Sequence, residues 1–316
     1  MSKKVTVIGA GNVGATLAYT LSLGNIASEI VVIDINKEKV EGEVMDIVQG
    51  TSFREPISVV AGDYEDAKDS DIVIITSGKG RKPGQTRIDL AQTNVNILKE
   101  ITPQIVAVAP KALYVIVSNP VDIMTYVFTK ISGLPESQII GSGTILDTAR
   151  LRYDLSNHFG IAQKNIHAYV YGEHGDTSFV PWSLAFIGNN PLSQYKDCAP
   201  DGDTIKWDES SYEEMENFVK TSGAQVIKSK GATFFAVAIS VCHICKCILD
   251  GAGTALTVST MMHGEYGVDD VCLSTPAIVG RGGIRGKIMN KLTDEEIAKF
   301  QNSANKLKEV IAGLEI

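Results

Sequence analysis

A histidine lies between two glycines near the middle of the chain, in Gly172-Glu173-His174-Gly175-Asp176. The ordinary pKa of histidine is the closest to neutrality of any side chain, so this ring can both donate and accept a proton. The glycines allow the main chain to approach whatever the ring contacts. By itself, such a histidine is more often a loop residue than a catalyst. Other residues of the chain must decide between these two interpretations.

An acid and a base with helical spacing lie upstream, in Leu146-Asp147-Thr148-Ala149-Arg150. Residues three apart project to the same face of a helix, so Asp147 and Arg150 are expected to lie side by side. An arginine can bind a carboxylate through two parallel hydrogen bonds, and an aspartate beside an imidazole favours the protonated ring. This segment could therefore hold a carboxylate ligand, and Asp147 could favour a protonated imidazole if one lies beside it.

A glycine-rich turn follows the first predicted strand and opens a predicted helix, in Gly9-Ala10-Gly11-Asn12-Val13-Gly14. This glycine pattern allows a tight turn, a close approach of the main chain to a pyrophosphate, and tight packing of helix on strand. Asp34 follows Gly14 by 20 residues, at the end of the second predicted strand, where its carboxylate can accept hydrogen bonds from ribose hydroxyls. The sequence therefore predicts a dinucleotide site built from Gly9, Gly11, Asn12, Val13, Gly14 and Asp34.

Asp34 also indicates which dinucleotide is bound. Its negative charge would repel a 2′-phosphate, and the next residue, Ile35, offers no cation to bind one. Lys39 could reach a phosphate of the cofactor or could simply be solvated. We therefore expect NAD rather than NADP.

Short β-branched runs alternate with helical patterns in the first half of the chain, which predicts a parallel sheet covered by helices on both faces. The predicted strands are Lys4–Ile8, Ile30–Asp34, Ile57–Val60, Ile72–Thr76 and Tyr114–Val117. The predicted helices are Asn12–Ser22, Lys37–Gln49 and Leu90–Ala109, the last with a kink or break at Pro103.

The second half of the chain is richer in long helices. We expect helices over Thr148–Phe159, Tyr212–Lys228, Thr233–Asp250 and Asp294–Ala312, a strand pair near Ile166–Tyr171 and Leu184–Ile187, and a surface loop over Lys196–Ser211. The fold class is therefore α/β, with a Rossmann-type doubly wound parallel sheet in residues 1–143 and a second α+β catalytic domain in residues 144–316. The cysteines of Cys242-His243-Ile244-Cys245-Lys246-Cys247 lie in an apolar helical run without a second CxxC, which favours a buried helix over a metal site.

Composition excludes several classes of partner. The net charge of −8 argues against nucleic acid or an anionic membrane surface. We find no stretch of about 18 apolar residues that would span a membrane. The five cysteines and the interrupted N-terminal apolar run predict reduced thiols and a cytoplasmic protein.

Two further motifs complete a recognisable set. They are the segment Gly78-Lys79-Gly80-Arg81-Lys82-Pro83-Gly84-Gln85-Thr86-Arg87 and the tripeptide Ser118-Asn119-Pro120. With the glycine-rich turn and the Asp147 and His174 segments, they occur in the order typical of the lactate/malate dehydrogenase family, which the chain resembles from end to end. The resemblance implies a hydride transfer between NAD and a small 2-keto or 2-hydroxy acid.

The resemblance also implies roles for individual residues. His174 would donate the proton, Asp147 would orient the imidazole, Arg87 would polarise the substrate carbonyl, and Arg150 would bind the substrate carboxylate. Substrate contacts are further implied for Asn119, Arg81 and Thr233, and cofactor contacts for Lys39, Gly78, Val117 and Asn119. The cationic loop from Arg81 to Arg87 could close over the substrate as a lid, bringing Arg87 in and expelling water.

The markers of substrate choice conflict. Arg81 matches the malate branch of the family, since an arginine there would pair with the second carboxylate of oxaloacetate but would lie unpaired beside the pyruvate methyl. Thr233 matches the lactate branch, as do Glu173, the Thr177–Ser183 segment, the Lys230–Thr233 segment and the Ser274–Val279 segment. We expect pyruvate and L-lactate as substrates, with a malate or dual-specificity enzyme as the alternative.

Arg152 and His167 match the pair that binds fructose 1,6-bisphosphate in bacterial members of the lactate branch. The resemblance therefore implies a possible allosteric effector and a homotetramer. Two other classes stay open: the NAD-dependent family 4 glycosidases, which need a metal and lack the Asp147, Arg150 and His174 set, and a non-enzymatic NAD-binding protein.

Overall fold

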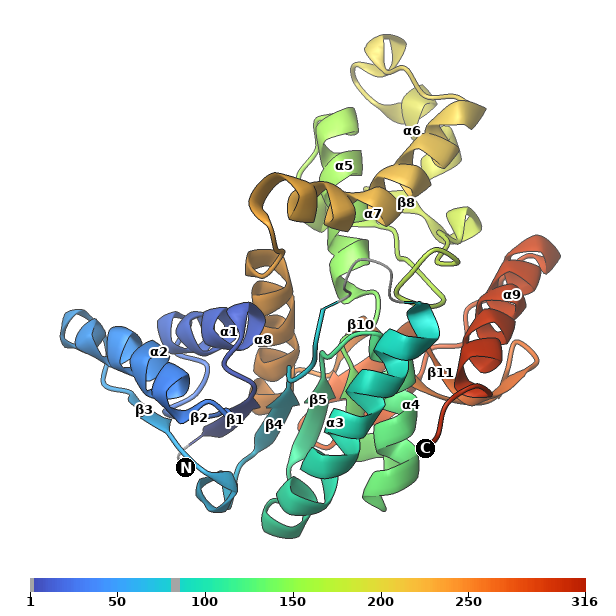
Figure 1. Cartoon of the computed structure of the whole chain (residues 1–316). Coiled ribbons are helices and arrows are strands. Elements are labelled where there is room, and N and C mark those ends of the chain that lie inside the picture. Colours follow the sequence, from blue (N-terminus) through green and yellow to red (C-terminus); the bar gives the residue numbers. More distant parts are fainter. Residues whose placement is uncertain (1–2, 81–85) are drawn as a thin grey trace.

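The computed structural model describes residues 3–80 and 86–316, with only the main chain described for Arg87 and Thr204. Its centre is a nine-stranded sheet in the order β12-β11-β10-β6-β5-β4-β1-β2-β3 (Figure 1). The parallel part consists of β1 (Lys4–Ile8), β2 (Glu29–Ile33), β3 (Ser58–Ala61), β4 (Ile72–Ile75), β5 (Leu113–Ile116) and β6 (Ile139–Gly141). The strand order reverses between β1 and β4, and this reversal is the usual site of ligand binding in a doubly wound sheet.

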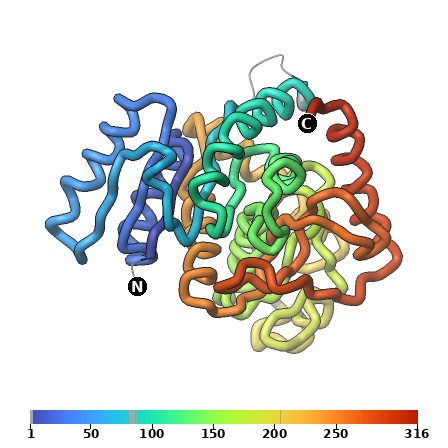
Figure 2. Tube along the Cα trace, turned by 90° about the horizontal axis from the view of Figure 1, so that it is seen from below, coloured from blue at the N-terminus to red at the C-terminus, as the bar shows by residue number. Residues whose placement is uncertain are grey.

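Helices cover both faces of the sheet because the strand residues alternate between two apolar cores. Val5, Val7 and Ile74 pack into one core, beside helices α1 (Asn12–Leu23), α2 (Lys37–Gln49) and α8 (Phe235–Asp250). Ile8 and Ile75 pack into the other core, beside α3 (Arg87–Val108), α4 (Val121–Ser132) and α9 (Asp294–Ile311). Figure 2 shows the same arrangement from below.

A third core lies in the second half of the chain, where α5 (Ile145–Phe159) and α7 (Glu209–Lys230) pack on β7 (Ile166–His167) and β8 (Phe186–Ile187). In Figure 1 these elements lie together with α6 (Leu192–Cys198) at the top of the view. A small antiparallel sheet joins β7, β8 and β9 (Asn190–Pro191). The remaining elements are the strands β10 (Thr254–Glu265), β11 (Val268–Gly280) and β12 (Gly283–Lys287), and the short 3-10 helices Thr51–Phe53, Tyr64–Ala67, Glu136–Gln138, Gln163–Asn165, Trp182–Leu184 and Gly202–Thr204.

The predicted fold class is confirmed, and the predicted elements match to within a few residues at their ends. Three expectations need correction. The long helix α3 continues through Pro103 without a break, and the segment expected as a surface loop begins within the last turn of α6 and ends in the first turn of α7 (Glu209–Lys230). The antiparallel strands β10, β11 and β12 were not anticipated, and they extend the parallel sheet because β10 pairs with β6. The boundary between the two predicted domains stays a prediction.

The cysteine-rich segment lies in α8, as expected. Cys242, Cys245 and Cys247 are buried in the core. Within the described ranges, no cluster of three or more histidine, cysteine or acidic side chains could hold a metal ion. The same ranges contain no helix long and apolar enough to cross a bilayer.

Candidate active site

Three predicted residues meet between α5 and the loop that follows β7. Asp147, in the first turn of α5, accepts a hydrogen bond from Arg150 Nη1 at 2.9 Å on one oxygen and faces His174 Nδ1 at 2.6 Å with the other. The side chain of Asp147 is 7% exposed and that of His174 is 30% exposed. Asp147 therefore orients both the guanidinium and the imidazole, and its spacing from Arg150 predicted the first of these contacts.

The charges of this cluster determine its protonation. The carboxylate of Asp147 raises the pKa of His174 to about 9, against the opposing effect of burial. Burial alone would raise the pKa of Asp147, but the nearby imidazolium and the Arg150 guanidinium hold it below its ordinary value. The pair therefore carries a protonated imidazole and an ionised carboxylate at neutral pH.

Hydrogen bonds of its own main chain attach the His174 loop to neighbouring elements. Gly172 exchanges two hydrogen bonds with Ser274 of β11, and its φ of +91° is one that side-chain-bearing residues rarely adopt. Ser303 of α9 accepts a hydrogen bond from Glu173 N at 2.8 Å, and Asp122 of α4 accepts one from His174 N at 2.7 Å. The imidazole therefore stands on a main chain anchored to three different elements.

A cavity of about 230 Å³ opens beside the imidazole. Asn119, Asp122 and Glu173 line it with His174, and Lys306 of α9 lies in its wall. Its size suits a ligand of a few heavy atoms. The structure therefore places His174 and Asn119 at one cavity, as expected for residues that share a substrate.

Asn119, at the cavity, and Arg150, at Asp147, lie on different elements. Asn119 follows β5 and precedes a cis peptide bond to Pro120, and its carbonyl accepts a hydrogen bond from Asn94 Nδ2 at 2.7 Å. Arg150 lies against α7 at Gly223, where a Cβ atom would be 3.4 Å from Nη2. The lack of a side chain at Gly223 leaves room for the guanidinium.

The glycine-rich turn connects β1 to α1 as the sequence predicted. A Cβ atom on Gly14 would collide with the Gly9 carbonyl oxygen, and one on Gly9 would lie 2.8 Å from Thr76 Oγ1. Gly11, in contrast, faces open space. Gly11 is also the N-cap of α1, where no side chain caps the helix within the described part of the chain. The first N–H groups of α1, including those of Asn12 and Val13, therefore fit a pyrophosphate.

Asp34 lies at the carboxyl end of β2, close to this turn. Its two oxygens accept hydrogen bonds from Ala10 N at 2.6 Å and Asn36 N at 2.9 Å. Each carboxylate oxygen can accept a further bond, so ribose hydroxyls can still be bound. The neighbouring Ile35 is 99% exposed and Lys39 is exposed on α2, so the carboxylate of Asp34 is the charge nearest this turn among the predicted cofactor residues.

The remaining predicted cofactor residues lie at the same edge of the sheet. Gly78 is exposed after β4, next to Asn94. The side chain of Val117 is buried in the core after β5, so a contact with the cofactor is expected from its main chain.

Comparison with known proteins identifies the chain's relatives. Profiles for the NAD binding domain and the alpha/beta C-terminal domain of lactate/malate dehydrogenase match residues 3–141 and 144–315. The L-lactate dehydrogenase of Acetivibrio thermocellus is 47% identical over 315 residues, which cover 99% of this chain and 98% of that protein. L-lactate dehydrogenase 1 of Clostridium acetobutylicum is 46% identical, with 97% of this chain and 96% of that protein covered.

The chain belongs to the lactate/malate dehydrogenase family. The crystal structure of the minor L-lactate dehydrogenase from Enterococcus mundtii, in the ligands-bound form, matches this fold with a TM-score of 0.94 at 36% identity, covering 100% of this chain and 99% of that one. The family identification supplies the NAD cofactor that the glycine-rich turn and Asp34 fit.

For three of the predicted site residues, the structure of this lactate/malate dehydrogenase gives little or no contact information. Arg81 lies outside the described residues, and only the main chain of Arg87 is described, at the start of α3. Thr233 is half-buried between α7 and α8. The roles predicted for these three residues stay predictions.

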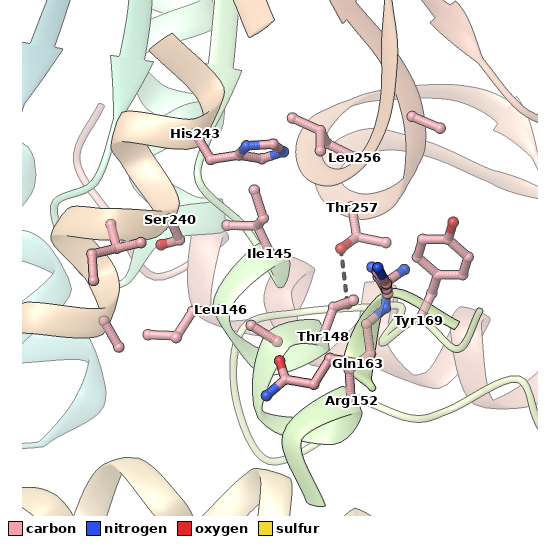
Figure 3. Close-up of a pocket in the computed structure, with 15 residues that line it drawn as sticks. Ile145, Leu146, Thr148, Arg152, Gln163, Tyr169, Ser240, His243, Leu256 and Thr257 are labelled. Carbon is pink, nitrogen blue, oxygen red and sulfur yellow. Dashed lines mark hydrogen bonds between the residues drawn. The ribbon is translucent and has the colours of Figure 1, made fainter. Parts of the chain in front are cut away.

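The predicted effector residues Arg152 and His167 lie away from His174. Arg152 Nε donates a hydrogen bond to the Ala168 carbonyl at 3.0 Å, and its guanidinium stacks on the Tyr169 ring at 4.6 Å. Arg152 lines a cavity of about 480 Å³ bounded by α5, α8 and β10, where Figure 3 shows it facing Tyr169 and Thr257. His167 is exposed on β7, and no described contact links it to Arg152.

Sequence analysis did not identify Asp122, which binds the main chain of His174, or Ser259, which binds Asp122. Asp122 and Ser259 lie close to His174 only because α4 and β10 meet beside its loop. Asp122 lies three residues after Asn119 in a helix first turn, where an acid is ordinarily explained by the helix dipole. Ser259 carried no sequence signal at all.

Proposed function

We propose that this chain interconverts pyruvate and L-lactate with NAD as the cofactor. The contacts of Asp147 with both His174 and Arg150, together with the cavity beside His174, carry the proposal, because they provide a proton donor next to a cation that can bind a carboxylate. Relatives named L-lactate dehydrogenase match over nearly the whole chain and favour lactate over malate.

Each residue has one task in this reaction. NADH, when bound at the β1–α1 turn, supplies the hydride. Asp147 holds Nδ1 of His174, which leaves Nε2 to give its proton to the substrate oxygen as the carbonyl becomes an alcohol. Arg150 keeps its second nitrogen, Nη2, for the substrate carboxylate. In the direction of lactate oxidation, the neutral imidazole takes the proton back.

Further assignments rest on the family resemblance. We propose that Arg87 polarises the carbonyl, that Asn119 and Thr233 contact the substrate, and that Arg81 borders its variable end. We also propose a cytoplasmic homotetramer with an anion site for fructose 1,6-bisphosphate at Arg152 and His167. The stacking of Arg152 on Tyr169 presents its guanidinium at a large cavity, which supports this site.

Steady-state kinetics with pyruvate and oxaloacetate test the substrate assignment. We expect kcat/KM for pyruvate to exceed that for oxaloacetate by at least about tenfold, or 1.4 kcal/mol. A preference for oxaloacetate of the same size would identify a malate enzyme and would give Arg81 the deciding role. Repeating both assays with fructose 1,6-bisphosphate, and with Arg152→Gln as a control, tests the effector: activation that Arg152→Gln abolishes supports the anion site, and unchanged rates contradict it.

A further inference from the structure

Asp122 is a buried acid that the reaction above does not use. It lies in the first turn of α4 and is 3% exposed. One carboxylate oxygen accepts a hydrogen bond from His174 N at 2.7 Å, and the other accepts one from Ser259 Oγ at 2.6 Å. Burying a charge is costly, and these two hydrogen bonds offset part of the cost of an ionised Asp122.

We propose that Asp122 is a positioning residue for His174, which fixes the main chain beneath the imidazole and supplies a second negative charge that favours the protonated ring. This inference rests on the proposed role of His174 as the proton donor.

The geometry supports the first part of this role. Asp122 lies three residues after Asn119, so one rigid helix start carries both Asn119 and the acceptor of the His174 N–H. Ser259 pairs with Gly141 at the junction of β10 and β6, where the parallel and antiparallel parts of the sheet meet. Asp122 therefore ties the proton donor and a proposed substrate-binding residue to the centre of the sheet.

The charges around the imidazole support the second part. Asp147 and Arg150 face it from α5, Asp122 from α4, Glu173 from its own loop, and Lys306 lies in the cavity wall on α9. Asp147 and Asp122 both raise the pKa of His174, whereas Arg150 lowers it. Burial raises the pKa of Asp122 to about 6, against the bond from Ser259, so this acid is ionised at neutral pH.

Titration of the free protein by NMR tests the proposal without any substrate. Histidine labelling gives five imidazole signals, and His174→Gln identifies the one that belongs to His174. Asp122→Asn keeps the shape of the side chain and can still accept the His174 N–H, but removes the charge. We expect the midpoint of the His174 titration to move to lower pH by about one pH unit.

Glu296→Gln is the matched control. Glu296 is another buried acid, on α9, and it accepts hydrogen bonds from Ser183 N at 3.1 Å and Ser183 Oγ at 2.7 Å. This variant should lose stability without moving the His174 midpoint. An unchanged midpoint in Asp122→Asn, or an equal shift in Glu296→Gln, would overturn the proposal.

If Asp122→Asn does not fold, the Ser259→Ala variant tests the same proposal. This variant keeps the carboxylate but removes a hydrogen bond that favours its ionised form, so the inflection that ionisation of Asp122 produces in the His174 NMR signal should move from about pH 6 to higher pH. An inflection at the parent position in Ser259→Ala, or none in the parent, would also overturn the proposal. A shifted NMR midpoint in a protein that turns over neither pyruvate nor oxaloacetate would instead contradict the proposed function and leave the role of Asp122 standing.

Discussion

At the scale of single residues, the site depends on how Asp147 divides its two oxygens. One oxygen binds Arg150 and the other binds His174, so a single buried carboxylate positions the proposed carboxylate-binding group and the proposed proton donor together. The same contact determines the protonation of the imidazole, because the negative charge of Asp147 is the main reason that the pKa of His174 lies near 9.

The pH dependence of the two reaction directions should follow from this pKa. Pyruvate reduction needs the protonated ring, so its kcat/KM should be nearly constant from about pH 7 and fall as the pH rises through about 9. Lactate oxidation needs the neutral ring, so its kcat/KM should rise over the same range. Initial rates at saturating cofactor between pH 6 and pH 10 would measure both limbs, and limbs near the ordinary pKa of about 6.5 would contradict the assignment.

The Arg150→Lys variant tests whether the site needs only the positive charge of Arg150 or also the geometry of its guanidinium. A lysine keeps the positive charge but cannot contact Asp147 and a substrate carboxylate through separate nitrogens. We expect kcat/KM for pyruvate to fall by about 2 kcal/mol, or roughly 30-fold, with much of the loss in KM. Lys220→Arg, on the exposed side of α7, controls for exchange of the two cations and should leave the kinetics unchanged. A parent-like Arg150→Lys enzyme would show that the fork is not needed.

At the scale of elements, two glycines of the turn between β1 and α1 differ in the space around them. Gly14 has no room for a side chain because the Gly9 carbonyl occupies the position, whereas Gly11 faces open space at the uncapped start of α1. The same motif therefore contains one glycine that the packing of α1 on β1 requires and one that we propose the cofactor requires.

Gly14→Ala and Gly11→Ala should differ accordingly. Gly14→Ala should lower Tm, because the added methyl group forces α1 away from β1. Gly11→Ala should keep Tm near that of the parent and weaken NADH binding by about tenfold or more, because its methyl group would lie where the pyrophosphate approaches. Thermal melts and fluorescence titration with NADH would measure both effects. Unchanged NADH affinity in Gly11→Ala would mean that the phosphates lie elsewhere.

At the scale of the whole molecule, one sheet joins the two halves of the chain. The bridge between Gly141 of β6 and Ser259 of β10 connects the parallel strands to the antiparallel hairpin. A Cβ atom on Gly141 would lie 2.7 Å from Ser259 Cβ and closer still to Thr125 Oγ1. The contact between the halves therefore depends on a position that has no side chain.

Gly141→Ala should lower the free energy of unfolding by about 2 kcal/mol, because the methyl group overfills this junction. It should also reduce activity, since Ser259 supports Asp122 beneath His174. Gly42→Ala is the control: it lies in the helix α2 with open space around it, and should stabilise the protein by about 0.5 to 1 kcal/mol. Urea denaturation would compare the two variants, and equal stabilities would refute the junction argument.

The sequence by itself predicted five of the six parallel strands and the residues that we propose for the chemistry. Strand and helix patterns are local, and so are the glycine-rich turn and the spacing of Asp147 and Arg150 on α5. His174 was a candidate because of its chemistry, but its partner lies 27 residues away in the sequence. The family resemblance supplied that pairing before the structure showed it.

Only the tertiary structure decided what surrounds the imidazole. Asp122 and Ser259 are 137 residues apart, and they meet because β10 extends the sheet at β6. Such contacts depend on strand order and on how helices pack over the sheet, which no local pattern encodes. The sequence therefore indicates the groups that we propose to react, and the fold determines the charges and hydrogen bonds that set their protonation.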